Sequence, residues 1–199
     1  MKPTTIPQLG YALMGLIHQK PSSGYDLRKV FAETAMGNYS SSAGAIYPAL
    51  ERLEAAGLIR GTVEEMGGLR RRKLYHLSPR GLTELKKWLL LPVESDDVLR
   101  GSGELMLRFS FMERALGASA CIAFLESFRK ALSGYLPELE SFLAGHAKDM
   151  TLSSRLALES GIRGYQSLHD WTAYALLEYR GASPKAHSRT KTTTAGGRK

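Results

Sequence analysis

The sequence predicts a mainly α-helical protein with two parts. The first is an N-terminal winged helix-turn-helix, made of three helices, a two-stranded wing and a fourth helix. The second is a C-terminal domain of long antiparallel helices that dimerises. Three observations predict this fold: apolar stripes at helical spacing within residues 7–56, two strand-like segments within residues 58–77, and apolar heptads beyond residue 103.

The three N-terminal helices follow from apolar stripes and from the residues that flank them. The first helix is expected over residues 7–19. The second begins after Ser23, with Asp26 three residues later, the spacing of a reciprocal N-terminal cap. The third lies within residues 40–56 and ends at Gly57, because glycine is the usual residue just beyond a helix.

A hairpin and a fourth helix complete the N-terminal part. Residues 58–64 and 72–77 predict two short strands, and Met66-Gly67-Gly68-Leu69 supply the turn between them. Ser78 then caps a fourth helix whose first position is Pro79, a residue that the first turn of a helix tolerates well. The order helix, helix, helix, hairpin, helix is that of a winged helix-turn-helix.

The C-terminal part begins after a break at residues 91–103, which contain proline, glycine and a Ser-Asp-Asp cluster. A helix over about 105–116 precedes a run of apolar residues spaced alternately by four and three positions. The run comprises Cys121, Leu125, Phe128, Leu132, Tyr135, Leu139 and Phe142. Such spacing is typical of a long helix that packs on another long helix, although Pro137 is expected to kink it. A last helix is expected over about 154–179.

The heptads also predict how two copies of the chain associate. The residues expected at the dimer interface are Leu125, Phe128, Leu132, Leu139, Leu158 and Ile162. Cys121 occupies a position of the same stripe and is expected to be a small buried thiol.

Composition sets limits on the class of protein. The chain has 199 residues, a formal net charge of +8 and one cysteine, which excludes an internal disulfide and any cysteine zinc site. No apolar run is long enough for a transmembrane helix, and the N-terminus lacks the apolar core of a signal peptide. These features predict a soluble cytoplasmic protein without a membrane partner.

The charge is distributed unevenly and indicates three segments. Residues 1–92 carry 13 basic and 7 acidic side chains, residues 93–180 carry 9 and 12, and residues 181–199 carry 5 and none. We therefore expect a basic winged helix-turn-helix over 1–92, a helical dimerisation or effector domain over 93–180, and a disordered basic tail over 181–199. Chance variation between solvated surfaces is the alternative explanation.

Double-stranded DNA is the partner that the basic N-terminal part predicts. The third helix opens with small polar residues that allow close approach to a phosphate or a base edge, namely Ser40, Ser41, Ser42, Gly44 and Ala45. The expected hairpin tip carries four consecutive cations, Arg70, Arg71, Arg72 and Lys73, which can neutralise phosphates or enter the minor groove.

Three further side chains near this surface admit two interpretations each. Tyr47 either donates to a phosphate or braces the wing, and Tyr25 either packs on the third helix or contacts a ligand. Arg52 either binds a phosphate or forms a surface ion pair with Glu51 or Glu54.

Other functions are less compatible with these residues than DNA binding. A winged helix can instead serve as a protein–protein adaptor, but that use requires neither the polar helix entrance nor the cationic hairpin. Ser127 and Lys130 match a Ser-x-x-Lys pattern in mid-helix without its usual partners, and the five histidines have no metal-ligand spacing, so neither an enzyme nor a metal site is predicted. No cofactor is expected. Tyr165, Trp171 and Tyr174 form either part of the core or a site for a small aromatic effector.

The motifs of residues 6–90 resemble those of the PadR family of transcriptional regulators. The similar segments are Gly24-Tyr25-Asp26, the third-helix run Gly44-Ala45-Ile46-Tyr47-Pro48 through Gly57-Leu58-Ile59, and Arg72-Lys73-Leu74-Tyr75-His76-Leu77-Ser78. Ala45 stands where many members have threonine. The second half is similar, more loosely, to the C-terminal domain of the virulence-activator branch, through Glu104–Phe109 and His169-Asp170-Trp171.

The resemblance implies a homodimer held by its C-terminal helices. It also implies binding to a pseudo-palindromic operator, repression in many members, and in some members release of DNA when a small aromatic ligand binds.

Overall fold

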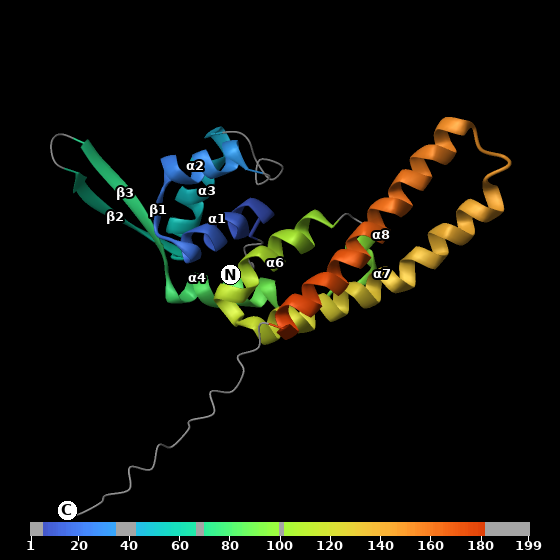
Figure 1. The fold of residues 1–199 in the computed structure, drawn as a ribbon. Helices are drawn as coiled ribbons and strands as arrows, with labels where there is room; N and C mark the ends of the chain where they lie inside the picture. The colour runs from blue at the N-terminus through green and yellow to red at the C-terminus, as the bar shows by residue number, and fades with distance from the viewer. Residues whose placement is uncertain (1–5, 35–42, 67–69, 100–101, 182–199) are drawn as a thin grey trace, which may run out of the picture.

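The computed structural model describes residues 6–34, 43–66, 70–99 and 102–181 (Figure 1). It is mainly helical, with a winged helix-turn-helix at the N-terminus and a helical region at the C-terminus. The elements of the first part are α1 (Gln8–Gln19), β1 (Ser22–Ser23), α2 (Gly24–Glu33), α3 (Ala43–Ala55), β2 (Ile59–Met66), β3 (Arg70–Leu77) and α4 (Pro79–Leu89). Those of the second are α5 (Ser95–Leu99), α6 (Gly103–Leu116), α7 (Ala118–His146) and α8 (Leu152–Gly181).

The wing is a three-stranded antiparallel sheet in the order β1-β3-β2. Strands β2 and β3 pair from Ile59 opposite Leu77 to Met66 opposite Arg70. The sequence predicted these two strands but not β1, whose Ser22 and Ser23 pair with Tyr75 and Leu74. A strand of two residues is too short to show an alternating pattern in the sequence, so β1 is recognised only from its pairing with β3.

Local hydrogen bonds fix the starts of α2 and α4 as predicted. The Ser23 hydroxyl accepts from the Asp26 amide, and the Asp26 carboxylate accepts from the Ser23 amide, which together form a capping box. The Ser78 hydroxyl accepts from the Gly81 amide at 2.9 Å, with Pro79 at the first helical position. Gly57, at φ 69°, follows α3 in the left-handed region that glycine favours.

The two parts of the chain share one hydrophobic core. Helix α1 packs on α4 and α6: the ring of Tyr11 stacks on that of Trp88 at 4.6 Å, and Gly15 lies against Phe111 so closely that a methyl group there would overlap the ring. The predicted boundary at residue 92 lies between α4 and α5, but packing continues across it. The winged part and α6 are therefore held together by side chains.

A buried guanidinium strengthens this connection. Arg108 of α6 is 3% exposed and donates to the carbonyl oxygens of Leu89, the last residue of α4, and of Leu91, two residues beyond it. It also lies over the ring of Phe124 at 5.3 Å, and burial lowers the pKa of the guanidinium. The end of α4 is thereby joined to α6 and α7.

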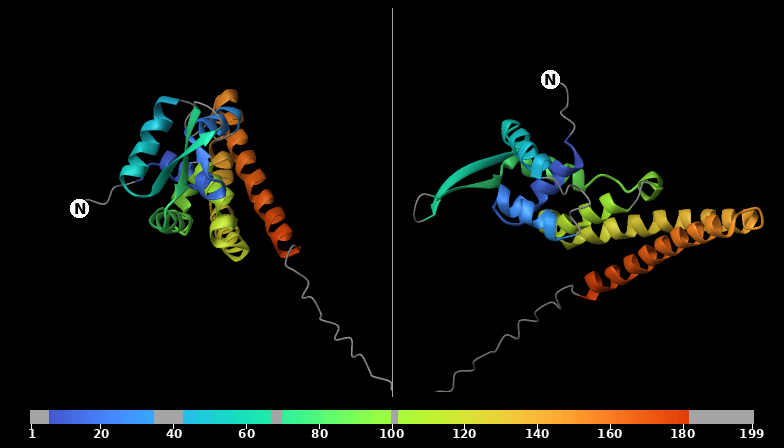
Figure 2. Two further views of the ribbon diagram at one scale, coloured as in Figure 1. Left: turned by 90° about the vertical axis from the view of Figure 1, so that its left-hand side faces the viewer. Right: turned by 90° about the horizontal axis from the view of Figure 1, so that it is seen from above.

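Helices α7 and α8 form a long antiparallel hairpin that projects away from the wing (Figures 1 and 2). Helix α7 continues through Pro137 as one uninterrupted helix. The break predicted at residues 91–103 contains the short helix α5. Cys121 is fully buried, as expected.

The heptad stripe of α7 packs within the chain, which corrects the dimer prediction. Leu125, Phe128 and Leu132 are each 0% exposed in the single chain, against α6 and α8 or the core beneath them. Ile162 is also buried, while Leu139 and Leu158 are half-buried. Side chains that one chain already encloses have no surface to offer a second copy, so the first three are core residues rather than interface residues.

Candidate nucleic-acid interface

Helix α3 is held by one apolar face and exposes the other. Ile46, Leu50 and Leu53 are at most 5% exposed and fix the helix on α1 and α2. The opposite face exposes Gly44 and Tyr47, and Ala45 is half-buried. Ser40, Ser41 and Ser42, predicted as the helix entrance, lie outside the described residues.

Tyr47 packs against α2 rather than against the wing, and it remains partly exposed. Its ring packs against the backbone of Gly24, where an added Cβ would lie 2.6 Å from the ring carbon Cε1. The side chain is nevertheless 44% exposed. Glycine at position 24 is therefore required for the close approach of α2 and α3, and the outer edge of the Tyr47 ring faces solvent.

The N-terminal turn of α2 adds residues that the sequence analysis did not assign to DNA. Tyr25 is 61% exposed rather than packed on α3, and the guanidinium of Arg28 lies 5.5 Å from its ring centre. The spacing of three residues on a helix could have indicated this pair. Together with Tyr47 they form an exposed surface of aromatic and cationic groups at the junction of α2 and α3.

The four cations predicted at the hairpin tip lie on strand β3 instead, and they are not equivalent. Arg72 forms an ion pair with Asp26 of α2, and Lys73 donates to Glu54 of α3 at 2.6 Å. Arg71 is exposed, and no described side chain forms an ion pair with it. The backbone of Arg70 pairs with that of Met66, and its side chain lies outside the described ones.

Acidic residues across the hairpin further reduce the net charge of the wing. Glu64 lies opposite Arg72, and Glu65 lies opposite Arg71 in the strand register. Among the described wing cations, Arg72 and Lys73 each have a carboxylate partner on a helix. The wing therefore presents fewer unpaired cations than its run of consecutive basic residues indicated.

The two carboxylates that bind wing cations are stabilised in their charged form. Burial alone raises the pKa of Asp26, but hydrogen bonds from Ser23 and from the Arg72 guanidinium outweigh it and lower the pKa below its usual value. The Lys73 ammonium lowers the pKa of Glu54. Both carboxylates are therefore charged at neutral pH and can pair with the wing cations.

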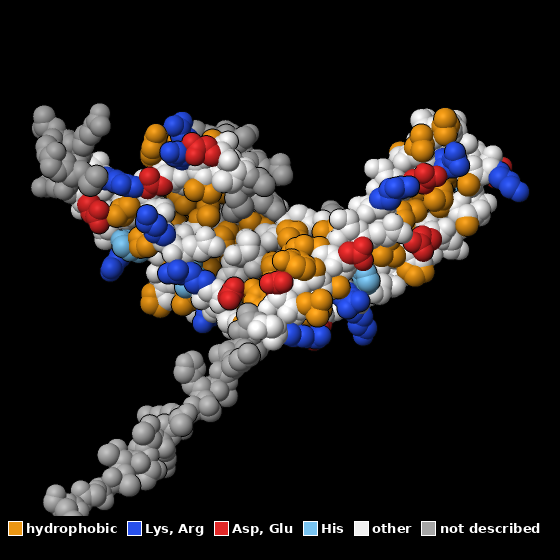
Figure 3. All heavy atoms as spheres, in the orientation of Figure 1, with side chains coloured by type: hydrophobic (Ala, Val, Ile, Leu, Met, Phe, Trp, Pro, Cys, Tyr) orange, Lys and Arg blue, Asp and Glu red, His pale blue; other side chains and the backbone are white. Residues whose placement is uncertain are grey.

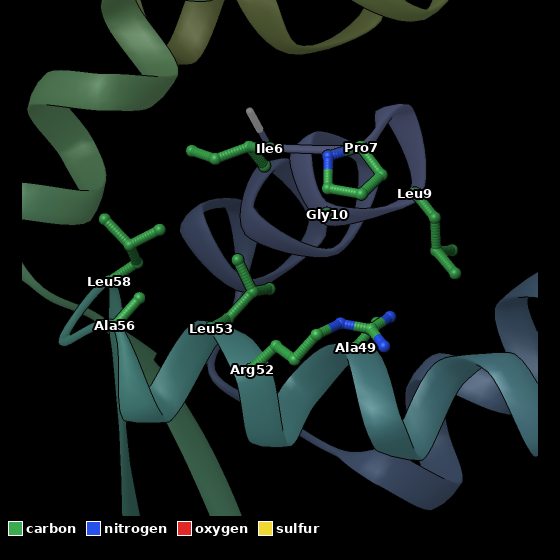
Figure 4. Close-up of a pocket in the computed structure, with 9 residues that line it drawn as sticks. All are labelled: Ile6, Pro7, Leu9, Gly10, Ala49, Arg52, Leu53, Ala56 and Leu58. Carbon is green, nitrogen blue, oxygen red and sulfur yellow. The ribbon is translucent and has the colours of Figure 1, made fainter. Parts of the chain in front are cut away.

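Arg52 lies beside a cavity rather than in an ion pair. Within the described part of the chain it pairs with neither Glu51 nor Glu54. The cavity, of about 170 Å³, lies between α1 and α3 and is otherwise lined by Ile6, Pro7, Leu9, Gly10, Ala49, Leu53, Ala56 and Leu58. Figure 4 shows the Arg52 side chain extending along α3 toward Ala49. Its guanidinium is exposed and available to an anion.

The three aromatic residues predicted to form either core or an effector site do not converge. The Tyr165 hydroxyl donates to the Val98 carbonyl oxygen at 3.2 Å, and the Trp171 ring meets Phe109 edge-on at 5.4 Å. Tyr174 instead points outward and is 59% exposed. The first two are packing residues, and the third belongs to the outer face of α8.

The described ranges offer neither a metal cluster nor a membrane span. There, no three His, Cys, Asp or Glu side chains gather in a way that could hold a metal ion. No helix in those ranges has both the length and the apolar content needed to cross a bilayer.

Comparison with known proteins agrees with the helix-turn-helix geometry. Residues 13–87 match the model of the transcriptional regulator PadR-like family. This segment is similar to the PadR-like family of transcriptional regulators. The resemblance inferred from the motifs is thus confirmed for residues 13–87.

Two relatives extend the similarity beyond residues 13–87. This chain is 29% identical to the negative transcriptional regulator PadR of Bacillus subtilis over 149 residues, which cover 73% of this chain and 80% of the relative. Over 187 residues, covering 86% and 99%, it is 27% identical to a probable transcriptional regulator of Mycobacterium tuberculosis. The crystal structure of Bacillus subtilis PadR in complex with operator DNA has a TM-score of 0.42 and 23% identity, over 89% of this chain and 99% of that one.

Proposed function

We propose that this protein is a sequence-specific DNA-binding transcriptional regulator that acts as a homodimer on a pseudo-palindromic operator. The observation that carries the proposal is the exposed face of α3 beside exposed Tyr25, Arg28 and Arg71, in a segment similar to the PadR-like family. Helix α3 enters the major groove with its first residues, including Gly44 and Ala45 and, by prediction, Ser40, Ser41 and Ser42.

Phosphate contacts come from the groups around α3. Arg28 with Tyr25 lies at the start of α2, Tyr47 on α3, and Arg71 on the wing. Arg52 contributes a further exposed cation. Arg70 is the remaining candidate at the wing tip. Arg72 and Lys73 are committed to carboxylates and hold the wing in place.

Dimerisation is proposed to use the outer face of α8. Leu152, Leu156, Tyr174 and Leu177 are 50–67% exposed on this helix, an unusual concentration of large apolar groups on a surface. Figure 3 shows apolar side chains along the projecting arm of α7 and α8. Binding to two half-sites requires this dimer to hold its two copies of α3 about one turn of DNA, ~34 Å, apart.

Repression is the proposed mode of regulation, since one relative is named a negative transcriptional regulator. The C-terminal helices are proposed to be of the virulence-activator kind, a part of the resemblance that rests on Glu104–Phe109 and His169-Asp170-Trp171 alone. Response to a small aromatic effector stays a prediction, because Tyr165, Trp171 and Tyr174 do not line a common site.

The test is fluorescence anisotropy with the duplex upstream of this protein's own gene and with a scrambled duplex, over a series of salt concentrations. We expect tight binding to the first only, with a steep decrease of log K as log salt increases. Equal and weak binding to both duplexes would contradict operator recognition and favour the adaptor.

Arg71→Ala tests the wing contact. Because Arg71 is exposed and reaches backbone rather than bases, we expect this variant to weaken binding to the operator and to the scrambled duplex alike. The slope of log K against log salt should flatten by about one unit. Lys148→Ala, which removes an exposed cation from the far arm, is the matched control. An unchanged slope in the Arg71 variant would exclude this contact.

Tyr47→Phe separates the two roles of that side chain. The phenylalanine keeps the ring against Gly24 but lacks the hydroxyl, so thermal stability should not change. If the hydroxyl donates to a phosphate, operator affinity falls roughly fivefold, equivalent to about 1 kcal/mol for one hydrogen bond. Unchanged affinity would leave Tyr47 with the packing role alone.

A further inference from the structure

Consecutive cations of strand β3 are held by carboxylates on two different helices. Arg72 pairs with Asp26 of α2, and Lys73 with Glu54 of α3. Neighbouring residues of a strand point to opposite faces of the sheet. The wing is therefore held from both faces, by the two helices that form the helix-turn-helix.

The Asp26 contact joins three elements at one atom. Its Oδ2 accepts from the Ser23 amide at 3.1 Å, from the Ser23 hydroxyl at 2.8 Å and from the Arg72 guanidinium. Ser23 is itself paired with Leu74 of β3. The start of α2, the edge strand β1 and the wing strand β3 thus form a closed loop of contacts.

The Glu54 contact joins α3 to both long strands of the wing. Its Oε2 accepts from Lys73 of β3 at 2.6 Å, and its Oε1 accepts from the Gly61 amide of β2 at 3.1 Å. A Cβ at Gly61 would lie 2.8 Å from Glu54 Oε1 and would overlap the Lys73 side chain. Glycine at this strand position leaves the space in which the carboxylate and the ammonium meet.

We propose that Asp26 and Glu54 are positioning residues which clamp the wing against α2 and α3 and so fix the distance between the recognition helix and the wing tip. The proposal rests on the proposed DNA-binding function. Half-exposed ion pairs contribute little to the free energy of unfolding. The clamp therefore fixes the orientation of the wing relative to α3. With that spacing fixed, the protein makes its major-groove contacts and its backbone contacts together only on a DNA site of matching geometry.

A competing explanation, in which the carboxylates only mask the wing cations, predicts the opposite change in DNA affinity when a carboxylate is removed. If the carboxylates only mask Arg72 and Lys73, DNA phosphates would compete for these cations, and removing a carboxylate would strengthen binding to every duplex. If the carboxylates clamp the wing, removing one weakens binding to the operator in particular, although the net charge becomes more positive.

The first measurement is a cycle of Glu54→Gln, Lys73→Gln and the double variant, with operator and scrambled duplexes over a salt series. We expect each single variant to lower the ratio of operator affinity to scrambled-duplex affinity about tenfold. The double variant should have a ratio no lower than that of either single variant. The slope of log K against log salt should stay unchanged in Lys73→Gln. Glu51→Gln removes the same charge from an exposed position of α3 and is the control, with no loss of the ratio. Asp26→Asn should behave like Glu54→Gln.

Equal strengthening of both duplexes by Glu54→Gln and Glu51→Gln would overturn the clamp, as would a reduced salt slope in Lys73→Gln. A melting temperature close to that of the unmodified protein shows that a lost ratio does not reflect unfolding.

A second measurement needs no DNA and separates the clamp from the proposed function. Two spin labels are attached at Lys29→Cys on α2 and Val63→Cys on the wing, in a Cys121→Ala background that leaves no other cysteine. The labelled protein is diluted with unlabelled chain, so that double electron–electron resonance measures only the distance within one chain. We expect a narrow distribution that broadens when Asp26→Asn and Glu54→Gln are added. An unchanged distribution refutes the clamp. A broadened one, in a protein whose unmodified form does not distinguish the operator, upholds the clamp and refutes operator recognition.

Discussion

Leu177→Asp is expected to separate the homodimer into monomers and to abolish tight operator binding. Leu177 is 67% exposed on α8, one turn beyond Tyr174, which is also exposed. An aspartate there would be desolvated without a partner in the proposed interface, at a cost that a dimer of ordinary size does not tolerate. Light scattering should report half the mass, and operator affinity should fall by at least ~100-fold, because one copy engages one half-site.

The control is the same substitution at Leu90, which is 62% exposed at the end of α4 rather than on the arm. Leu90→Asp should remain dimeric. A Leu177→Asp protein that keeps both its mass and its affinity would place the interface elsewhere on the chain.

Gly81→Ala is expected to destabilise the fold strongly, although it adds a single methyl group. Gly81 lies in the first turn of α4 and is packed against the backbone of Leu58, so that a Cβ would overlap the Leu58 carbonyl oxygen. That carbonyl accepts from the Ser78 amide, and neither group can rotate away as a side chain would. We expect a loss of about 2–4 kcal/mol in the free energy of unfolding, measured by urea denaturation.

Gly134→Ala provides the contrast. Gly134 lies within α7, and a Cβ there meets no atom within 4 Å. Because alanine favours helix over glycine, this variant should gain roughly 0.5–1 kcal/mol. A Gly81→Ala protein as stable as Gly134→Ala would show that the root of the wing can shift freely relative to α4.

In the wing, the sequence predicted the hairpin and its basic residues but not the partners of those residues. Four consecutive basic residues predicted a cationic surface, and the hairpin itself is present. The pairing of Arg72 and Lys73 could not be predicted, because Asp26 and Glu54 are 46 and 19 residues away in sequence. Which carboxylate reaches which cation depends on how α2 and α3 pack on the sheet. The pair of Tyr25 and Arg28 has a local spacing of three residues, but its exposure likewise depends on how α2 packs.

The sequence by itself determined the elements whose signals are local. Caps at Ser23 and Ser78 depend on residues three positions away, and helical stripes depend on a period that one segment contains, so α2, α4 and α7 could be predicted from composition and spacing. Only the tertiary structure decided what covers each apolar face. A heptad stripe specifies that Leu125, Phe128 and Leu132 are buried, but a helix of the same chain and a helix of a second copy satisfy it equally. Here α6, α8 and the core of the same chain bury these residues, since the α7–α8 hairpin brings its partner helix within reach.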